Sequence, residues 1–335
     1  MVLKKILIIR FSSIGDIVLT TPVLRCLKQQ VQDAEIHYCL KKQYAPVMQA
    51  NPYIDKLHLF DGSLGKLAEN LRAEQFDYII DLHNSLRSGL LKMKLHVPSN
   101  AFPKLNIEKW LLVNLKINRL PDLHIVDRYF MAAKYFGIQN DGMGLDYFIS
   151  NDDAYNPSWL PPAYQQRFVA FVTGGRHKTK ILPPEKIVEV CSLLHHPVVL
   201  LGGPEDTETA EQVAVKLPGK VFNACGMFSL NRSAAIVKQS AVVITNDTGL
   251  MHIAAAFRKN IISIWGNTVP EFGMHPYLPV NGNTESVMFE VKNLSCRPCS
   301  KIGYSKCPKK HFDCMNRLDA GQIAGAANAL LEKNV

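Results

Sequence analysis

The stretch VVITNDTGLMHIAAA, residues 242–256, decides the fold of this chain. Its first residues are β-branched and apolar, which is typical of a strand buried in a parallel sheet. Residues 246–248 are helix-capping types, Gly249 lets the backbone turn closely, and the Ala-rich remainder favours a helix. Such a junction leaves backbone N–H groups at the positive end of the helix dipole, where a phosphate could bind. An ordinary capped helix, with His252 as a structural residue, explains the same pattern.

Size and composition fit a globular protein of two domains. The chain has 335 residues, more than one hydrophobic core usually holds, with 47% hydrophobic and 20% charged residues. Its net charge of +9 favours an anionic partner: a nucleotide, a phosphorylated substrate or an anionic membrane surface. Nucleic acid fits less well, because the sequence has no zinc finger, no RNP-type aromatic motif and no sustained Lys/Arg tract.

The sequence predicts a cytoplasmic protein. No apolar run is long enough to cross a membrane, and the apolar residues 6–9 are too few for the core of a signal peptide before Arg10 interrupts them. Four cysteines lie among apolar segments and are expected to be reduced core residues, which are Cys26, Cys39, Cys191 and Cys225.

Apolar strands alternate with helical segments in both halves of the chain, which indicates parallel, doubly wound α/β sheets. The predicted strands are residues 5–10, 36–40, 56–60, 76–82, 168–173, 197–201, 242–245 and 260–265. The predicted helices are residues 16–29, 45–50, 64–74 and 207–217, with others beginning near residues 184 and 250. Residues 101–131 suggest a helical insertion or loop region, and the polar, proline-rich residues 151–167 suggest a domain linker.

Two turns follow predicted strands at the sheet edge where α/β proteins bind ligands. The Ser-Ser-Ile-Gly turn at residues 12–15 precedes Asp16, a carboxylate that is either a helix cap or a general base. The basic run 176–180 follows a Gly-Gly turn and is either a solvated loop or, with the helix start after Asp247, a grip for a diphosphate. The sequence lacks the Gly-x-Gly-x-x-Gly and Gly-x-x-x-x-Gly-Lys-Ser/Thr motifs, which weakens a dinucleotide dehydrogenase or a P-loop NTPase.

Four segments occur in the order seen in glycosyltransferase family 9, the bacterial lipopolysaccharide heptosyltransferases. They are ILIIRFSSIGDIVLTTPVLRCLK (residues 6–28), KTKILP (178–183), LLGGPEDTETAE (200–211) and ITNDTGLMHIAAA (244–256). The chain resembles this family over nearly its whole length, which implies a GT-B fold: two Rossmann-like domains with parallel sheets that face across a cleft. The implied domains are residues 1–155 for the acceptor, 165–317 for the donor, and a C-terminal helix at 318–335 that packs back on the first domain.

Residue by residue, the resemblance makes Asp16 the catalytic base and Lys180 the contact to the donor phosphate. It implies further donor contacts from Thr179, Asp247, Thr248, Gly249 and His252, and a ribose contact from Glu205 or Asp206. The implied acceptor contacts are Ser12, Ser13, Gly15, Thr20, Thr21, His83, Asn84 and Arg87.

The resemblance also implies inverting transfer without a metal. Asp16 would take a proton from the acceptor hydroxyl as it attacks the anomeric carbon. Lys180 and the N–H groups around Thr248 and Gly249 would stabilise the leaving nucleoside diphosphate.

Four cysteines near the C-terminus have the spacing C-x2-C-x7-C-x6-C. A structural zinc site, reduced thiols and a disulfide all fit this pattern, which is short for a zinc ribbon. The residues are Cys296, Cys299, Cys307 and Cys314, with His311 as a substitute ligand. We expect no catalytic metal here.

The leading interpretation is a glycosyltransferase that moves heptose from ADP-heptose onto a lipid A–core oligosaccharide and needs no cofactor besides its nucleotide sugar. The alternatives are the same mechanism with another nucleotide sugar, a nucleotide-sugar epimerase, and a non-catalytic protein that binds nucleotide or glycan. Because such acceptors are anchored in the inner membrane, we also expect peripheral contact with its cytoplasmic face. The Lys-rich residues 92–116 are the candidate for this contact.

Overall fold

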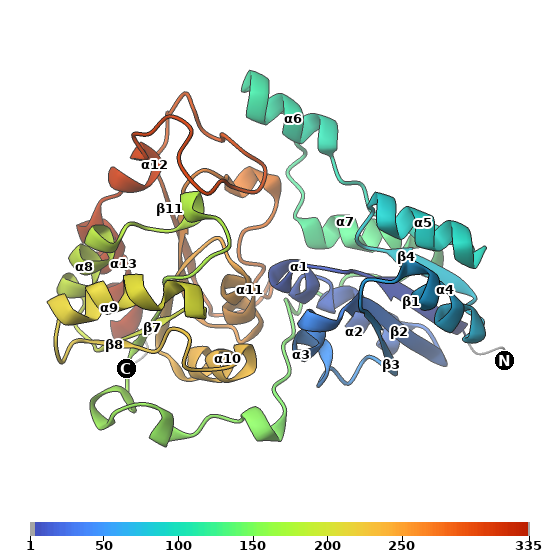
Figure 1. Cartoon of the computed structure of the whole chain (residues 1–335), viewed down its shortest axis with the longest axis horizontal. Coiled ribbons are helices and arrows are strands. Elements are labelled where there is room, and N and C mark those ends of the chain that lie inside the picture. Colours follow the sequence, from blue (N-terminus) through green and yellow to red (C-terminus); the bar gives the residue numbers. More distant parts are fainter. Residues whose placement is uncertain (1–3, 334–335) are drawn as a thin grey trace. The chain divides into compact units, whose positions relative to one another are not determined.

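The computed structural model describes residues 4–333 and forms two compact units (Figure 1). The first unit contains the chain as far as Leu105, with Leu123–Phe148 and Pro279–Asn281. The second contains Asn106–Asp122, Ile149–Leu278 and the chain from Gly282 onward. The first three and last two residues, which the predicted domains 1–155 and 318–335 include, lie outside the described residues.

The first unit is built on a parallel five-stranded sheet in the order β3-β2-β1-β4-β5. The strands are β1 (Lys4–Ile9), β2 (Ala34–Lys41), β3 (Lys56–Phe60), β4 (Tyr78–Asp81) and β5 (Ser99–Ala101). The apolar run from Ile6 to Ile9 is fully buried, which suits β1 to the centre of a sheet covered on both faces.

The helices of the first unit are α1 (Ile14–Val18), α2 (Thr21–Gln30), α3 (Ala45–Met48), α4 (Leu64–Ala73), α5 (Leu86–Leu95) and α7 (Ile125–Ala132). The single helix predicted over residues 16–29 is therefore two helices. Pro22 lies in the first turn of α2, where its missing N–H group costs no helical hydrogen bond.

The second unit contains a parallel six-stranded sheet in the order β11-β10-β9-β6-β7-β8. Its strands are β6 (Val169–Val172), β7 (Val198–Leu201), β8 (Val221–Asn223), β9 (Val242–Asn246), β10 (Asn260–Trp265) and β11 (Ser286–Glu290). Its helices are α6 (Asn106–Leu115), α8 (Pro184–Leu193), α9 (Thr207–Lys216), α10 (Leu230–Gln239), α11 (Gly249–Ala256), α12 (Asp313–Asn316) and α13 (Ala320–Glu332).

The C-terminal helix does not pack where the sequence predicted. Helix α13 packs against α8 and against β9 and β10, so it completes the core of the second unit and not of the first. Its buried face includes Ile323, Ala327 and Leu331, which join residues of α8 and α9 on one side of the sheet (Figure 1). The apolar stripe of this helix is therefore buried within the second unit, whereas the sequence had assigned the helix to the first domain.

The structure adds detail to the predicted helical insertion and to the predicted linker. Residues 101–131 are divided, because α6 belongs to the second unit, where Leu112 packs against Val269 and Phe272, whereas α7 belongs to the first. The predicted linker 151–167 holds three short 3₁₀ turns, at Asn151–Asp153, Pro157–Trp159 and Pro162–Tyr164.

Both sheets reverse their strand order at one point, where α/β proteins bind ligands. In the first unit the reversal lies between β1 and β4, and in the second between β6 and β9. None of the helices among the described residues is long and apolar enough to cross a membrane.

Candidate functional site

In the second unit, three polar side chains meet at the carboxyl ends of β6, β9 and β10. Lys180 Nζ lies 2.5 Å from Asp247 Oδ2, and the Thr268 hydroxyl donates to the same oxygen over 2.9 Å. Lys180 belongs to a 3₁₀ turn, Lys178–Lys180, that follows β6, whereas Asp247 directly follows β9. The pair is mostly shielded from solvent, which strengthens its attraction. The predicted donor-site residues Lys180 and Asp247 thus lie in direct contact.

The first turn of α11 lies beside this cluster. Thr248 is the N-cap residue in extended conformation, and its side chain makes no cap hydrogen bond. Gly175 lies close by, since a Cβ atom there would come within 3.4 Å of the Thr248 methyl group. The backbone at Gly175 therefore lies close to the start of α11. The N–H groups from Gly249 onward have no partner within the helix and can bind an anionic oxygen. His252 is buried within the same helix.

The two carboxylates predicted as alternatives for a ribose contact have different environments. Asp206 is buried, and its Oδ2 accepts a hydrogen bond of 3.0 Å from the Gly203 N–H, so it caps the 3₁₀ turn Pro204–Asp206. Burial raises the pKa of Asp206. Glu205 is exposed at the carboxyl end of β7. Of the two, Glu205 has the carboxylate that a ligand can reach.

The cysteine-containing segment, residues 296–307, forms hydrogen bonds with the loops that carry this site. Thr179 is buried, and its hydroxyl and N–H both bond the backbone of Tyr304, so this predicted donor contact has a structural role. Arg297 donates to the carbonyl oxygens of Gly266, at 2.6 Å, and Thr268, at 2.9 Å. The segment thereby fixes the turn that carries the Thr268 hydroxyl.

Sequence reasoning missed Asn267, Thr268 and Arg297. Asn267 is buried, and neither polar atom of its side-chain amide has a hydrogen-bond partner among the described residues, which is rare in folded proteins. The available signal was the polar Gly-Asn-Thr run directly after the apolar strand β10, the same pattern that marked Asp247 after β9.

In the first unit, Asp16 is held by two neighbours. Its Oδ1 lies 2.6 Å from Arg10 Nη2, and its Oδ2 accepts hydrogen bonds from the Ser13 hydroxyl, at 2.9 Å, and the Ser13 N–H, at 3.2 Å. Arg10 itself is buried and donates to the carbonyl oxygens of Ser12 and Leu82. It thus joins the ends of β1 and β4. Burial alone would lower the pKa of Arg10, but the charge of Asp16 offsets this and the pKa is raised.

The sequence left open whether Asp16 is a helix cap or a general base, and its environment fits both roles. It bonds Ser13 as a helix-capping residue, and it lies at the sheet edge with part of its carboxylate accessible. Gly15, which precedes it in α1, is buried.

The loop after β4 lies near Arg10. Burial and the charge of Arg10 lower the pKa of His83 to about 4, so its ring is neutral near pH 7. The ring packs edge-on against Phe11. Asn84 donates through its amide to the Phe102 carbonyl oxygen, and the exposed Arg87 lies over the ring of Phe60. Of these predicted acceptor residues, His83 is the one whose surroundings include Asp16.

The structure differs from the acceptor contacts predicted for Thr20 and Thr21. Both side chains are buried, and their hydroxyls donate to the carbonyl oxygens of Ile17 and Val18. The Thr20 hydroxyl also lies 3.0 Å from the Tyr38 hydroxyl. These hydroxyls hold the junction of α1 and α2, which explains why Thr is present at both positions.

The four C-terminal cysteines are free thiols, of which Cys314 is buried and the others are partly buried. Burial, with a smaller contribution from the other three thiols, raises the pKa of Cys314 to about 12. Cys296 Sγ lies 3.8 Å from His311 Nε2. Within residues 4–333, however, no three of these groups bring their ligand atoms within 4.8 Å of one another, so the structural zinc site stays a prediction.

Comparison with known proteins identifies the family. The model of glycosyltransferase family 9 (heptosyltransferase) matches residues 64–307. Lipooligosaccharide heptosyltransferase 2 of Haemophilus influenzae is 26% identical over 293 residues, which cover 80% of this chain and 84% of that protein. The family 9 glycosyl transferase structure from Veillonella parvula has a TM-score of 0.78 at 24% identity and covers 98% of both chains. The structure of E. coli heptosyltransferase WaaC with ADP has a TM-score of 0.69 at 20% identity and covers 99% of this chain and 100% of that one.

The likeness to solved heptosyltransferases confirms the predicted GT-B fold, with its two parallel α/β sheets. The family model matches well over half of the sequence. This chain therefore belongs to glycosyltransferase family 9, the heptosyltransferases, and is a glycosyltransferase.

Proposed function

We propose that this enzyme transfers heptose from ADP-heptose onto a lipopolysaccharide core acceptor, with inversion and without a metal. Curated relatives are named lipopolysaccharide or lipooligosaccharide heptosyltransferases, and a solved relative is described with ADP. The observation that carries the proposal is the cluster of Lys180, Asp247 and Thr268 beside the first turn of α11.

This cluster suits the diphosphate of the donor. As the bond to the anomeric carbon breaks, negative charge grows on the leaving phosphate. Lys180 supplies a positive charge at that point, and the N–H groups from Gly249 onward supply preorganised donors. Asp247 holds Lys180 in place, and Thr268 fixes the carboxylate of Asp247. In this proposal the exposed Glu205 accepts hydrogen bonds from the ribose hydroxyls.

Asp16 is the proposed general base. Its carboxylate is oriented by Arg10 and Ser13, and it keeps part of its surface accessible for an acceptor hydroxyl. The neutral ring of His83 nearby adds a polar group that carries no competing charge. No step in this scheme requires a divalent cation, because Lys180 and the α11 N–H groups neutralise the leaving group.

A lipid-anchored acceptor also fits helix α5 of the first unit, which begins just after the loop of His83. Leu86, Leu90 and Met93 recur at helical spacing and are 91%, 48% and 62% exposed. Exposed Arg87 and Lys94 belong to the same helix. An apolar stripe with basic neighbours suits the surface of an anionic bilayer, so we assign peripheral membrane contact to this helix.

The first experiment compares nucleotide binding with transfer. The melting temperature of the protein is measured with ADP-, UDP-, GDP- and CMP-linked compounds, and transfer from ADP-heptose to a core acceptor is measured with the product configuration by NMR. We expect stabilisation by ADP compounds, lost in Lys180→Ala and kept in Asp16→Asn. Transfer should fall about 10²- to 10⁴-fold in Asp16→Asn.

The other outcomes select among the alternatives. Stabilisation only by another nucleotide would keep the mechanism and remove heptose. Donor conversion without acceptor would favour an epimerase, and nucleotide binding without turnover would favour a binding protein. For the membrane contact, Leu86→Ser/Leu90→Ser should lose sedimentation with anionic phospholipid vesicles. Val215→Ser, at an exposed position of α9, should keep it.

A further inference from the structure

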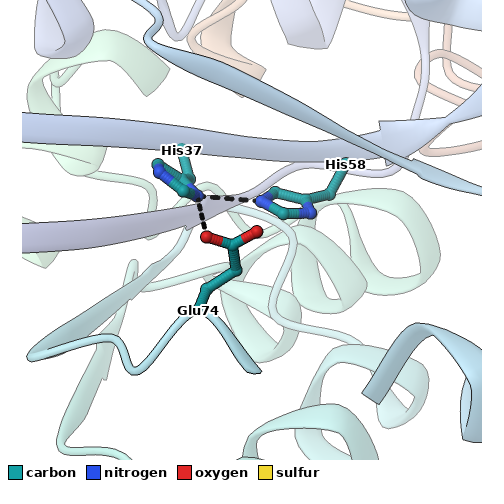
Figure 2. Close-up of side chains that lie close together, drawn as sticks. All are labelled: His37, His58 and Glu74. Atoms are coloured by element: carbon teal, nitrogen blue, oxygen red, sulfur yellow. Dashed lines mark hydrogen bonds and ion pairs between the residues drawn. The ribbon is translucent and has the colours of Figure 1, made fainter. Parts of the chain in front are cut away.

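The first unit contains a second cluster of chemically active side chains, which the transfer mechanism does not use. His37 on β2 and His58 on β3 lie on adjacent strands, and Glu74 lies directly after α4 (Figure 2). His37 is 1% exposed and His58 is 8% exposed. Two polar rings have thus been placed where apolar side chains usually pack.

The three ligand atoms converge. His37 Nδ1 lies 2.9 Å from His58 Nε2 and 3.9 Å from Glu74 Oε2. All three atoms lie within 4.8 Å of one another, and no other group of His, Cys, Asp or Glu within residues 4–333 meets this spacing. In Figure 2 the two rings and the carboxylate are directed toward one shared point.

The surroundings fix the rings in a ligating orientation. The other ring nitrogen of His37, Nε2, lies 2.7 Å from Glu35 Oε1. A carboxylate in this position holds the ring proton on Nε2 and leaves the lone pair of Nδ1 directed at the cluster, as second-shell carboxylates do for metal-bound histidines. Phe76 packs edge-on against both rings, with centroids 5.1 and 6.0 Å away.

The hydrogen bonds within the cluster also suit a cation. With Glu35 holding its proton, His37 can only accept at Nδ1, so the 2.9 Å contact needs a proton on His58 Nε2. A metal ion would take the place of that proton after His58 moves its proton to Nδ1.

We propose that His37, His58 and Glu74 bind a divalent metal ion of the Zn²⁺ class, in a site separate from the transfer chemistry. Neutral imidazoles with one carboxylate are a common zinc ligand set, and water would complete the coordination. Two Zn–N bonds of about 2.0–2.1 Å at a tetrahedral angle require the ring nitrogens to be roughly 3.3 Å apart. The present 2.9 Å therefore needs only a small opening of the pair.

Lys5 and Lys56 set the strength of the site. Lys56 pairs with Glu74 Oε1, and Lys5 Nζ lies 3.2 Å from Glu35 and 3.7 Å from Glu74 Oε2. These lysines neutralise the charges of Glu35 and Glu74, and their own positive charges repel the bound metal ion. The oxygen that faces His37, Oε2, is the one with the more distant lysine. Removal of the Lys56 charge should therefore strengthen metal binding.

The test is a titration of chelator-treated full-length protein with Co²⁺ and Zn²⁺, followed by calorimetry and by cobalt absorption. We expect one equivalent of Co²⁺ with d–d bands and no sulfur-to-cobalt charge transfer, since the ligands are N and O donors. Binding should weaken at least about tenfold in His58→Gln and in the partly exposed Glu74→Gln, and tighten in Lys56→Met.

Two controls separate this site from others. His195→Gln removes a histidine that is 66% exposed in the second unit, and Cys296→Ser/Cys299→Ser removes half of the cysteine set. Both should leave the titration unchanged. The proposal is overturned if no saturable binding occurs, if His58→Gln and Glu74→Gln bind as tightly as the wild type while folded, or if the cobalt spectrum shows thiolate ligands.

Discussion

Lys180 Nζ and Asp247 Oδ2 lie 2.5 Å apart, although the residues are 67 positions apart and follow different strands of the second sheet. These strands, β6 and β9, are the neighbours between which the strand order reverses. The ion pair therefore stands at the point where a doubly wound sheet leaves room for a ligand. A bound diphosphate would share Lys180 with Asp247, so the carboxylate sets the position of the cation as well as part of its charge.

Substitution of Lys180 by Ala should weaken binding of the donor nucleotide at least about tenfold, because a partly buried cation that faces the leaving phosphate is lost. The matched control is Lys178→Ala, which removes an exposed lysine from the same 3₁₀ turn. Calorimetry with ADP measures both variants. Equal losses in the two would mean that net charge, and not the Lys180 geometry, attracts the nucleotide.

Arg10 should be a positioning residue for Asp16. Arg10→Lys keeps the charge but cannot reach Asp16, Ser12 and Leu82 together, because lysine lacks the planar fork of three nitrogens. We expect kcat to fall about tenfold or more while the donor KM stays the same. Steady-state kinetics with varied donor and acceptor provide the check, and a rise in donor KM with unchanged kcat would contradict this role.

Thr20 should contribute to stability and not to acceptor binding. Thr20→Val deprives the buried Tyr38 hydroxyl of its partner and should cost about 1–3 kcal/mol of unfolding free energy. In Thr20→Val/Tyr38→Phe both partners are gone, so the loss should be smaller than the sum of the single losses. Urea unfolding measures these values. A raised acceptor KM in a fully stable Thr20→Val protein would restore the predicted acceptor contact.

His83 should make the protein less stable in mild acid. Its pKa is about 4 in the folded protein and about 6.5 in the unfolded chain, since burial disfavours the charged ring. Between these values the unfolded chain binds the proton and the folded one does not. Stability is therefore complete above pH 6.5 and falls toward pH 4, by up to about 1.4 kcal/mol per pH unit.

Chemical unfolding of the wild type and His83→Gln at pH 7 and pH 5, in the presence of chelator, tests this dependence. The variant should lose less stability between the two pH values than the wild type does. The exposed His195→Gln should behave as the wild type. Identical pH dependence in His83→Gln and the wild type would show that other groups are responsible.

The sequence predicted eight of the eleven strands among the described residues, missing the edge strands β5, β8 and β11, and it predicted the polar turns that follow β1, β6 and β9, because these depend on local patterns. Apolar runs such as residues 242–245 become buried strands, and a polar run directly after a strand lies at the ligand edge whatever the rest of the fold. The pairing of Lys180 with Asp247 was expected in outline for this reason. Glu205 and Asp206 show the limit, since adjacent carboxylates look alike until burial separates the cap from the exposed group.

Long-range packing was less predictable. The apolar stripe of α13 fits any apolar surface, and nothing in its own residues specifies the second unit. Thr20 and Thr21 carry the same hydroxyl whether they bond a ligand or a neighbouring carbonyl, so their burial could not be read from residue type. Arg297 was missed because its partners are backbone carbonyl oxygens, which leave no trace in the sequence.

Arg297 should couple the cysteine-containing segment to donor binding. It bonds the carbonyl oxygens of Gly266 and Thr268 and forms a 2.6 Å ion pair with Glu290, all in largely buried surroundings. Arg297→Met should free the turn that presents the Thr268 hydroxyl to Asp247, and donor affinity should fall about tenfold as Lys180 loses its fixed partner. The same change leaves the Glu290 carboxylate without its cation, which should cost about 3–5 kcal/mol of stability.

The double variant Arg297→Met/Glu290→Gln separates these two effects. It removes the uncompensated charge, so unfolding in urea should show most of the lost stability regained. The turn remains without its anchor, however, and ADP binding by calorimetry should stay weak. If the double variant instead recovers full ADP affinity together with stability, Arg297 acts on the fold alone and the segment does not position the donor site.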